Sequence, residues 1–555
     1  METAIVMRFE ARVCGLAAGL SQVAAAVLLA VPAVAGAQQA ADAPEPGAIQ
    51  EQLDRERRDL EAAQQPGDEG PVLDVPEMRS GKLPETGERF TLKGVRFTES
   101  TVIPEERLRA IASDYVGREV GFDDLNEMVA RINRIYDERG QLTARAMIPP
   151  QRLDDGILRV TIVEGRLGSL RIEGNTYTHE DYIRSVIPVA PGEFVDVPAL
   201  RQRLQTLNRL SGLRYSAGLE AGEGFGESNV RVDVREPQRW RAQVFANTNG
   251  SDSTGQYQAG TFLVVNGPRG VSDRLVVYGI GAEGLASGYL GYEMPVTDSG
   301  GRLNVSATYT RTKIVGGGFE QLDITGDSKQ VSASYIGPWM NWGQTVLDWN
   351  ARASWLDSGS EISGGTLSDT KLYRLGTGVV LRGVGASGAR WRVSQELVVN
   401  RSDVFGEETQ TYATFPGEAT YAHPFTPRIS GLVKGSWQYA IKDQFASPSY
   451  YQAGGQSSVR GYDRGVLSAA RGGAVSAEAH WRVHPTTDLF YFVDYGFVEG
   501  RSQDFEQLRS TGAGVSAGTG TNWNASLTVG VPLRDVTQDQ DSYRIHAQLS
   551  YSFGS

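Results

Sequence analysis

This sequence has a single cysteine, no excess of basic residues and no long internal apolar run. Each of these properties argues against a class of function. The only cysteine is Cys14, which lies in the N-terminal segment and lacks the preceding small residues of a lipidation signal. Without that segment the chain has no thiol, which excludes disulfides and cysteine catalysis. A net charge of −12 argues against nucleic acid as a partner, because phosphate binding needs a basic surface.

No internal run of the chain is long and apolar enough for a transmembrane helix, which needs about 20 mostly apolar residues. If the protein enters a membrane, it must do so as a β-barrel. The 66 glycines are many for an ordinary enzyme.

Residues 1–37 have the pattern of a secretory signal peptide. Arg8 and Arg12 precede an alanine-rich apolar segment, and Ala35-Gly36-Ala37 forms a small-residue cleavage site. Met7 is an alternative start. The other interpretation is an N-terminal membrane anchor, which the cleavage site and Pro32 disfavour. Export to the periplasm or outer membrane of a Gram-negative bacterium follows.

Residues 38–66 are predicted to contain a helix, over 47–65, that ends before Pro66 and Gly67. Its apolar stripe is thin, and the helix is otherwise charged all round. Such a helix either bridges solvent or lies in a polar cavity, so a linker helix and a helix plugging a wet pore both remain open at this point. Residues 67–88, rich in Pro, Gly and Glu, are predicted to be a flexible linker.

Residues 89–165 and 166–238 form an internal repeat. Each copy is predicted to run strand, short helix, longer helix, strand, strand. The longer helices begin near Asp123 and Pro198, and glycines follow them at 140 and 212, where a C-cap belongs. Together with "RIEGN", "VTIVEG" and "VDVREP", this order resembles the POTRA (polypeptide-transport-associated) domains of outer-membrane transport proteins. The resemblance implies binding of extended polypeptide at a sheet edge.

Residues 239–555 are predicted to form sixteen strands of a transmembrane β-barrel. In the last, "SYRIHAQLSYSF", apolar and polar side chains alternate, as in a strand between lipid and a polar lumen. Aromatic residues gather near strand ends, for example Trp523, Tyr543 and Phe553. With strand one rising from the periplasm, connections after odd-numbered strands face outward, and the sixth of these spans residues 443–470.

This sixth outer loop contains "SSVRGYDRG", and the next strand but one contains Asp494. Alternation points Asp494 into the lumen beside Phe492 and Gly496. A loop arginine folded into the barrel needs a carboxylate partner, so we hypothesise a bidentate pair between Arg460 and Asp494. Taken singly, either residue is more simply a solvated loop or lumen residue.

Together these features are similar to the TpsB-type transporters of two-partner secretion, the haemolysin secretion/activation family. Its loop motif V-R-G-Y/F is matched by Val459, Arg460, Gly461 and Tyr462. Its strand motif F/G-x-D-x-G is matched by Phe492, Asp494 and Gly496. The resemblance implies a plug helix, two POTRA domains, a sixteen-stranded barrel and an Arg–Asp pair. The C-terminus departs from the family pattern, because Gly554 and Ser555 follow Phe553 where family members end in an aromatic residue. This departure bears on details of recognition by the barrel-assembly machinery and not on the class of protein.

The implied function is transport of a secreted, β-rich TpsA-like partner across the outer membrane in extended form, without ATP. The second repeat is the expected capture site, and Arg203 and Tyr215 are candidate, partly exposed cargo contacts. The alternative from the same superfamily is a barrel assembly factor, which usually carries more POTRA domains. A passive porin would not need the repeats. The sequence does not identify the cargo.

Enzyme-like patterns do not hold in their context, so we predict no catalytic, cofactor or metal site. "GIGAEG" at 279–284 is followed by a strand where a dinucleotide site needs a helix. "GVSAG" at 514–518 lies within an alternating strand. His480 and His484 share a strand face, but four residues place them about 13 Å apart, too far for one metal ion.

Overall fold

The computed structural model describes residues 45–64, 73–74 and 89–554, with short gaps at 154, 188, 225, 317–322, 363, 386, 501–502, 519–521 and 538–539. The predicted signal peptide (1–37) lies outside the described residues, as do residues 38–44 and most of the predicted linker. Within the described part, no helix is both long enough and apolar enough to cross a membrane.

Residues 89–164 form a first α+β unit. Its elements are β2 (Arg89–Thr91), β3 (Gly94–Phe97), α3 (Glu105–Ser113), β4 (Glu119–Gly121), α4 (Phe122–Glu138), β5 (Ala144–Met147) and β6 (Ile157–Glu164). The sheet order is β3-β6-β5, and β2 pairs with β4. The apolar face of α4 is buried against α3 and the sheet through Leu125, Ile132 and Tyr136. Gly140 ends this helix with a φ of 69°, which favours glycine.

Residues 166–235 form a second α+β unit with the same order of elements. They are β7 (Arg166–Glu173), α5 (Glu180–Val186), α6 (Val197–Leu210), β8 (Arg214–Ala221) and β9 (Glu227–Arg235). Asp196 caps α6 by accepting a hydrogen bond from the backbone N–H of Ala199. The sheet has the order β1-β8-β9-β7, in which β1 (Leu73–Asp74) adds to β8 in parallel. The predicted linker therefore contributes a short strand to this unit.

The glutamates of "VEG" and "REP" perform the same task in the two units. Glu164 accepts hydrogen bonds from the Ser100 hydroxyl (2.6 Å) and the Thr101 N–H (2.7 Å). Glu236 accepts them from the N–H groups of residues 176–178, at 2.8–3.0 Å. Burial raises the pKa of each carboxyl, but these hydrogen bonds outweigh it and the net pKa is lowered. Each glutamate thus fixes the turn that precedes the unit's first helix. This turn follows β3 in the first unit and β7 in the second.

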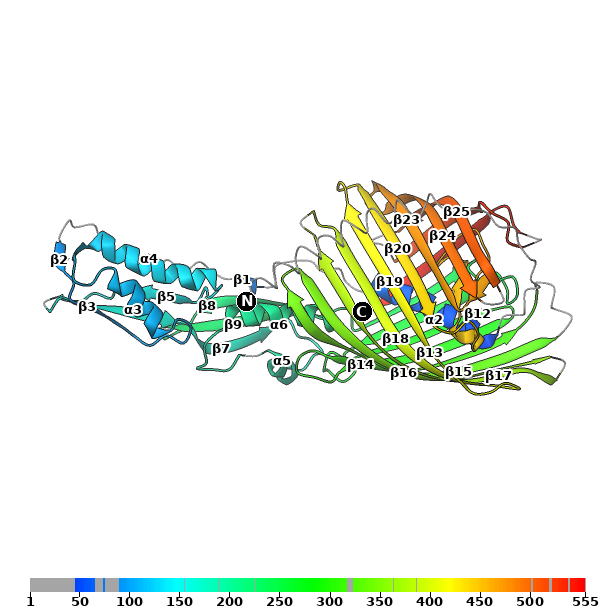
Figure 1. Ribbon diagram of the computed structural model, residues 1–555, viewed down its shortest axis with the longest axis horizontal. Coiled ribbons are helices and arrows are strands. Elements are labelled where there is room, and N and C mark those ends of the chain that lie inside the picture. Colours follow the sequence, from blue (N-terminus) through cyan, green and yellow to red (C-terminus); the bar gives the residue numbers. More distant parts are fainter. Residues whose placement is uncertain are drawn as a thin grey trace. The chain divides into compact units, whose positions relative to one another are not determined.

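Sixteen antiparallel strands form a closed barrel, which confirms the predicted strand number. Figure 1 shows the barrel from the side. In chain order the strands are β10 (Trp240–Asn247), β11 (Gln258–Asn266), β12 (Arg274–Ala282), β13 (Leu285–Pro295), β14 (Arg302–Lys313), β15 (Ile324–Trp342), β16 (Thr345–Ile362), β17 (Gly365–Val384), β18 (Arg390–Val404), β19 (Gln410–Pro424), β20 (Ile429–Ala440), β23 (Arg471–His484), β24 (Thr487–Gly500), β25 (Gln503–Ala517), β26 (Trp523–Pro532) and β27 (Arg544–Gly554).

The barrel closes where β27 pairs with β10, from Arg241 opposite Gly554 to Asn247 opposite Gln548. Along β27 the exposed side chains are Ile545, Leu549 and Phe553, whereas Arg544, His546 and Ser550 are buried. This is the alternation expected of a strand with lipid on one side and a lumen on the other. The sequence "GIGAEG" falls in β12 and its turn into β13, and "GVSAG" falls at the end of β25.

Candidate functional site

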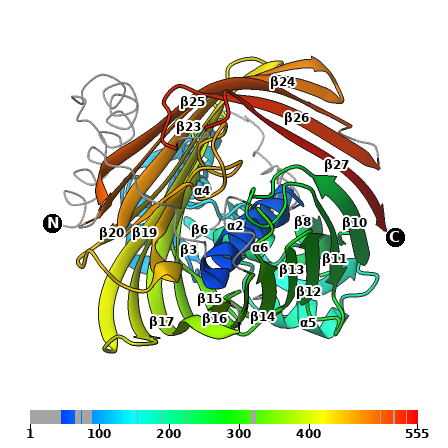
Figure 2. The same ribbon diagram turned by 90° about the vertical axis from the view of Figure 1, so that its right-hand side faces the viewer.

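A helix and a loop occupy the barrel interior. Figure 2 shows α2 (Pro46–Gln64) within the ring of strands. The predicted sixth outer loop connects β20 to β23 and is ordered, with a 3-10 turn η2 (Ser447–Ser449) and a small hairpin of β21 (Tyr451–Ala453) and β22 (Leu467–Ala469). We call residues 441–470 loop 6.

Arg460, at the tip of loop 6, lies in a pocket of the barrel wall and is only 6% exposed. Its Nε donates to Asp494 Oδ2 at 2.8 Å, and its Nη2 donates to Asp494 Oδ1 at 2.7 Å. The Arg460 backbone N–H also donates to Asp494, at 3.0 Å. This is a bidentate, charge-assisted contact between the loop and β24.

Two further groups of β23 and one of β24 complete the guanidinium pocket. Nη2 donates to the Ser476 hydroxyl at 2.7 Å, and Nη1 lies 2.8 Å from Glu478 Oε1. The guanidinium carbon sits 3.6 Å from the centre of the Phe492 ring, a cation–π distance. Ser476 is the register partner of Asp494, and Glu478 is that of Phe492.

The other motif residues of the loop tip are in close contact with the barrel strands. Val459 is fully buried, and a Cβ at Gly496 would come within 2.6 Å of it. Gly461 has a φ of 95° and lies against the backbone of Gly530. The Tyr462 hydroxyl lies 2.8 Å from the carbonyl oxygens of both Arg509 and Arg534. Each of these contacts needs the loop tip inside the barrel.

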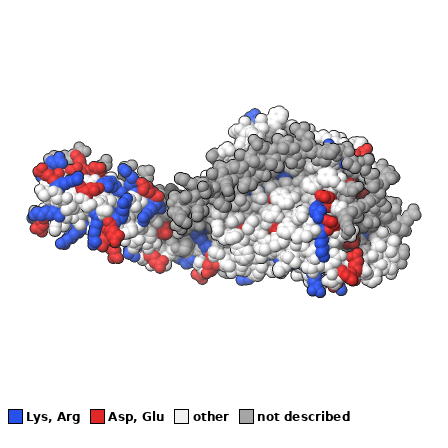
Figure 3. Space-filling view, in the orientation of Figure 1, with Lys and Arg blue, Asp and Glu red and all other residues white. Residues whose placement is uncertain are grey.

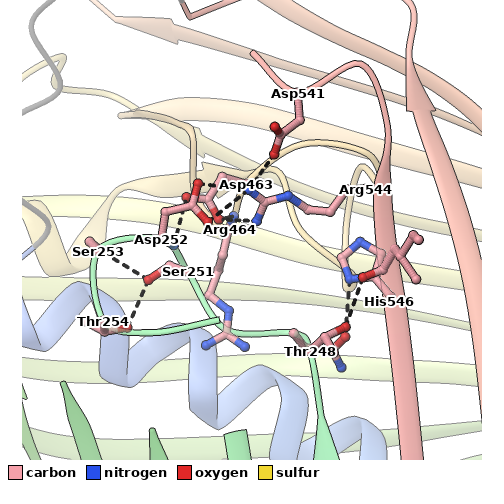
Figure 4. A network of polar contacts seen from close by, with 12 residues as sticks. Thr248, Ser251, Asp252, Ser253, Thr254, Asp463, Arg464, Asp541, Arg544 and His546 are labelled. Atoms are coloured by element: carbon pink, nitrogen blue, oxygen red, sulfur yellow. Dashed lines mark hydrogen bonds and ion pairs between the residues drawn. The ribbon is translucent and has the colours of Figure 1, made fainter. Parts of the chain in front are cut away.

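The two residues after the motif link the loop to three other segments, and Figure 4 shows the network around Asp463 and Arg544. Asp463 pairs with Arg544 of β27 at 2.7 Å. Arg544 also pairs with Asp252, in the β10–β11 connection, at 3.1 Å. Arg464 forms an ion pair with Glu56 of α2. Loop 6 is therefore in contact with both the seam between the first and last strands and the interior helix.

Polar contacts hold α2 along most of its length. Its backbone N–H at Gly47 donates to Ser358 at 2.9 Å, Gln50 donates to Gln330 at 3.2 Å, and Glu51 pairs with Arg374. Ile49 and Leu53 form a small apolar contact with barrel residues that include Phe262. The interface is mostly polar and charged, unlike a packed protein core.

Sequence comparison assigns this architecture to a family. Residues 226–521 match the model of the haemolysin secretion/activation protein family ShlB/FhaC/HecB, and residues 90–165 match the ShlB-type POTRA domain. The chain belongs to the ShlB/FhaC/HecB family. It is an outer-membrane transporter of the two-partner secretion type, with POTRA domains in the periplasm, and the barrel assembly factor is the less supported interpretation.

Individual relatives agree over almost the whole length. The heme/hemopexin transporter protein HuxB of Haemophilus influenzae is 23% identical, over 93% of this chain and 96% of its own. The outer membrane transporter CdiB of Dickeya dadantii is 24% identical, over 87% and 89%. The structure of CdiB from Escherichia coli superposes with a TM-score of 0.72 at 20% identity, covering 93% of this chain and all of that one, and shows the same fold.

One of the two predicted cargo contacts is wrong. Tyr215 is 1% exposed and belongs to the core of the second α+β unit, because β8 turns this side chain toward α6. Arg203 is partly exposed, and its Nε donates to the Val186 carbonyl at 2.6 Å. Alternation within "LRYSAGLE" places Tyr215 with Ala217 and Leu219 on the buried face, a signal that the sequence contained.

Glu478 and Ser476 are site residues that sequence reasoning missed. Both lie on the lumen face of β23, two and four residues before His480 in sequence. The alternation that placed Asp494 inward on β24 also places them inward on the neighbouring strand, so the hairpin register was the signal that could have found them.

Proposed function

We propose that this transporter captures a secreted, β-rich TpsA-like partner at the sheet edge of the second α+β unit and passes it in extended form through the barrel. The observation that carries the proposal is the filling of the lumen. A closed barrel contains a helix that is held mainly by ion pairs and hydrogen bonds, and a loop that is held by ion pairs, hydrogen bonds and an apolar cluster around Val459 and Tyr462. The polar contacts can exchange their partners for water or a passing polypeptide, and water that enters the lumen lowers the cost of breaking a buried pair.

The edge of β8, which already pairs with the short strand β1, supports the capture step. β1 pairs with β8 through Leu73 opposite Ala217 and Asp74 opposite Gly218. An extended partner segment can use the same backbone groups, which is β-augmentation. At the other edge of this sheet, the described part of the chain gives β7 a single isolated bridge, between Arg166 and Phe194, besides its pairing with β9. The partly exposed Arg203 remains a candidate contact for the partner.

The transport step requires α2 and loop 6 to leave the partner's path. Residues 38–66 would then act as a plug, and the motif residues Val459, Arg460, Gly461 and Tyr462, with Phe492, Asp494 and Gly496, as the anchor of loop 6. The periplasm contains no ATP, so folding of the partner outside would supply net direction. Outer-membrane lipid would surround the barrel, and the barrel-assembly machinery would insert it.

Site-directed cross-linking tests this route, because Cys14 is the only cysteine of the full chain. Glu418 faces the lumen, 3.9 Å from Arg392 across the β18–β19 pair, whereas its neighbour Ala419 faces outward. A partner stalled by a locked, folded C-terminal domain should cross-link to Cys in a Glu418→Cys variant and not in the matched Ala419→Cys variant. Secretion without lumen cross-links would contradict transport through the barrel.

A further inference from the structure

Arg544, the first residue of β27, is the centre of a charged network on the lumen side of the barrel. Its side chain is only 6% exposed, whereas the next residue, Ile545, points outward. Figure 3 shows few charged groups over the visible outer face of the barrel, except toward its right-hand end. Because a charge on the lipid side of a strand is costly, the inner side of the wall is the place for such a network.

Carboxylates from three different segments surround this one guanidinium, as Figure 4 shows. Nη1 of Arg544 donates to Asp463 of loop 6 at 2.7 Å. Nη2 donates to the two carboxylate oxygens of Asp252, in the β10–β11 connection, at 3.2 and 3.1 Å, and lies 3.6 Å from Asp541. With three carboxylates and one cation, the network has an excess of negative charge. The acids therefore repel one another wherever Arg544 does not stand between them.

The tip of loop 6 contacts two wall residues that are paired with each other. Gly530 of β26, whose backbone lies against Gly461, is the register partner of Arg544 on β27. The contacts of Gly461 and Asp463 therefore fall on one pair of neighbouring strand residues. The next loop residue, Arg464, forms an ion pair with α2. Fixing Asp463 at the wall consequently also fixes the loop residue that contacts the helix.

Asp252 lies on the far side of the seam between β10 and β27. The ladder of these two strands ends at Asn247, so residues 544–547 of β27 extend beyond it. Side chains take part in closing the seam there: the Thr248 hydroxyl donates to a carbonyl of β27 at 2.9 Å, and Asp252 binds Arg544. The guanidinium therefore holds the loop tip and the far side of the seam at the same time.

We propose that Arg544 is a positioning residue of loop 6. It acts through Asp463 as a second anchor of the loop tip, separate from the Arg460 pocket on β23 and β24, and it keeps Asp463 beside Asp252 despite their like charges. The anchor rests on the proposed function only in its use, since loop 6 must be seated before it can leave the path of a partner. Seating is measurable without a partner, so the anchor and the transport route can fail separately.

Tryptic cleavage after Arg460, measured by mass spectrometry on the full chain in dodecyl maltoside, tests the anchor, because seating buries this site. We expect Asp463→Asn, which keeps the side-chain shape and removes the charge, to speed this cleavage about tenfold through loss of a charge-assisted contact. Asp541→Asn is the matched control. Its acid is 61% exposed and 3.6 Å from Arg544, so its loss should leave the rate unchanged. An unchanged rate in Asp463→Asn, or an equal rise in the control, would overturn the anchor.

Charge balance tests Arg544 itself. Arg544→Ala should also speed the cleavage, and adding Asp252→Asn should restore much of the protection, because it removes a charge that repels Asp463. Adding Asp327→Asn instead, an acid of β15 that pairs with Lys329, should restore nothing. Failure of Asp252→Asn to protect, or protection by Asp327→Asn, would overturn the shared role of the guanidinium.

A disulfide across the seam separates positioning of the loop from closure of the barrel. Val244 and Tyr551 are register partners on β10 and β27, so Val244→Cys with Tyr551→Cys can lock the seam. In the locked protein, Arg544→Ala should still speed the cleavage. Full protection there would show that Arg544 only closes the seam, and would overturn the proposal. If Arg544→Ala does not insert, as judged by heat-modified gel migration, Asp463→Asn decides the question.

Discussion

Arg460 forms ion pairs with two carboxylates, those of Asp494 and Glu478. Substitution of the arginine should therefore affect secretion differently from substitution of one carboxylate. Removing Arg460 leaves Asp494, which is 1% exposed, and Glu478 close together without their common cation. Removing Asp494 leaves Arg460 with Glu478. Losing one member of a buried pair commonly costs about 3–5 kcal/mol, and less where water enters. The structure thus predicts an unequal effect of the two changes.

We therefore expect Arg460→Ala to reduce secretion more strongly than Asp494→Asn, at equal amounts of inserted barrel. The double variant should be no worse than Arg460→Ala, because the two side chains act as one unit. Quantitative immunoblots of secreted partner measure this. Arg392→Ala, which removes a lumen cation 3.9 Å from Glu418, is the control. Additive defects in the double variant would show that the pair is not the relevant contact.

Gly530 should matter as much as the motif glycine that it faces. A Cβ at Gly530 would lie 2.6 Å from the Gly461 nitrogen, which is backbone and cannot swing away. We expect Gly530→Ala to displace the loop 6 tip and to lower secretion. Gly288→Ala on β13 is the matched control, because nothing lies within 4 Å of its Cβ position. Protease accessibility of loop 6 is the readout, and unchanged protection would refute the tight fit.

Strand alternation was sufficient to predict that Asp494 points inward, because β24 has an unambiguous apolar face. It could not decide whether the loop enters the barrel, since that depends on contacts between residues 34 positions apart. Glu478 was missed because only Asp494 was considered as a partner. Tyr215 was misjudged because an aromatic ring with a hydroxyl fits equally well in a core and on a binding surface.

At the scale of elements, the composition of α2 did not determine where the helix lies. Its charged surface was compatible with a solvated linker and with a wet pore. The decision rests on its partners Arg374 and Arg464, which are 323 and 408 residues away in sequence. Neither partner is visible from the helix itself. The lumen location is therefore a result of the tertiary structure.

If α2 plugs the barrel, then deleting residues 38–66 should increase conductance in planar-bilayer recordings. Neutralising both ion pairs with Glu51→Gln and Glu56→Gln should also produce more frequent openings, because each loses a charged contact to the barrel or loop 6. Asp59→Asn, an exposed position on the same helix, is the matched control. Conductance that stays unchanged after the deletion would argue against a plug.

The first α+β unit should lose stability in acid through Glu164. Its hydrogen bonds hold the folded-state pKa below the ordinary value of 4.5 despite burial. The stabilisation is therefore complete above about pH 4.5 and is lost as the pH falls through the folded pKa. Pepsin cleavage within residues 89–165 should rise over that range. Glu164→Gln should make the cleavage less dependent on pH, whereas Glu105→Gln, on the exposed surface of α3, should not. An equal response in both variants would contradict this role.

For the whole molecule, periodicity predicted the strand number and the repeated α+β order, because both are written in local alternation and helix faces. The pairing of β1 with β8 was not predictable. It involves two residues from a segment rich in Pro, Gly and Glu, and its partner strand lies more than 140 positions later. Short strands of this kind are defined by the edge that receives them and have little pattern of their own.

Binding of the secreted partner at the edge of β8 can be tested in the whole transporter. Deleting residues 166–238 should abolish binding of the secreted partner and leave a heat-modifiable barrel, since β10–β27 close without that unit. Replacing Leu73 and Asp74 with proline removes backbone donors from β1 and should free the β8 edge. If the partner uses this edge, then its affinity for the Leu73→Pro, Asp74→Pro variant should increase, because no strand must first be displaced. Fluorescence anisotropy with a labelled partner fragment measures both effects. Partner binding that survives the deletion would place recognition elsewhere, and unchanged affinity in the proline variant would assign it to another surface of the same unit.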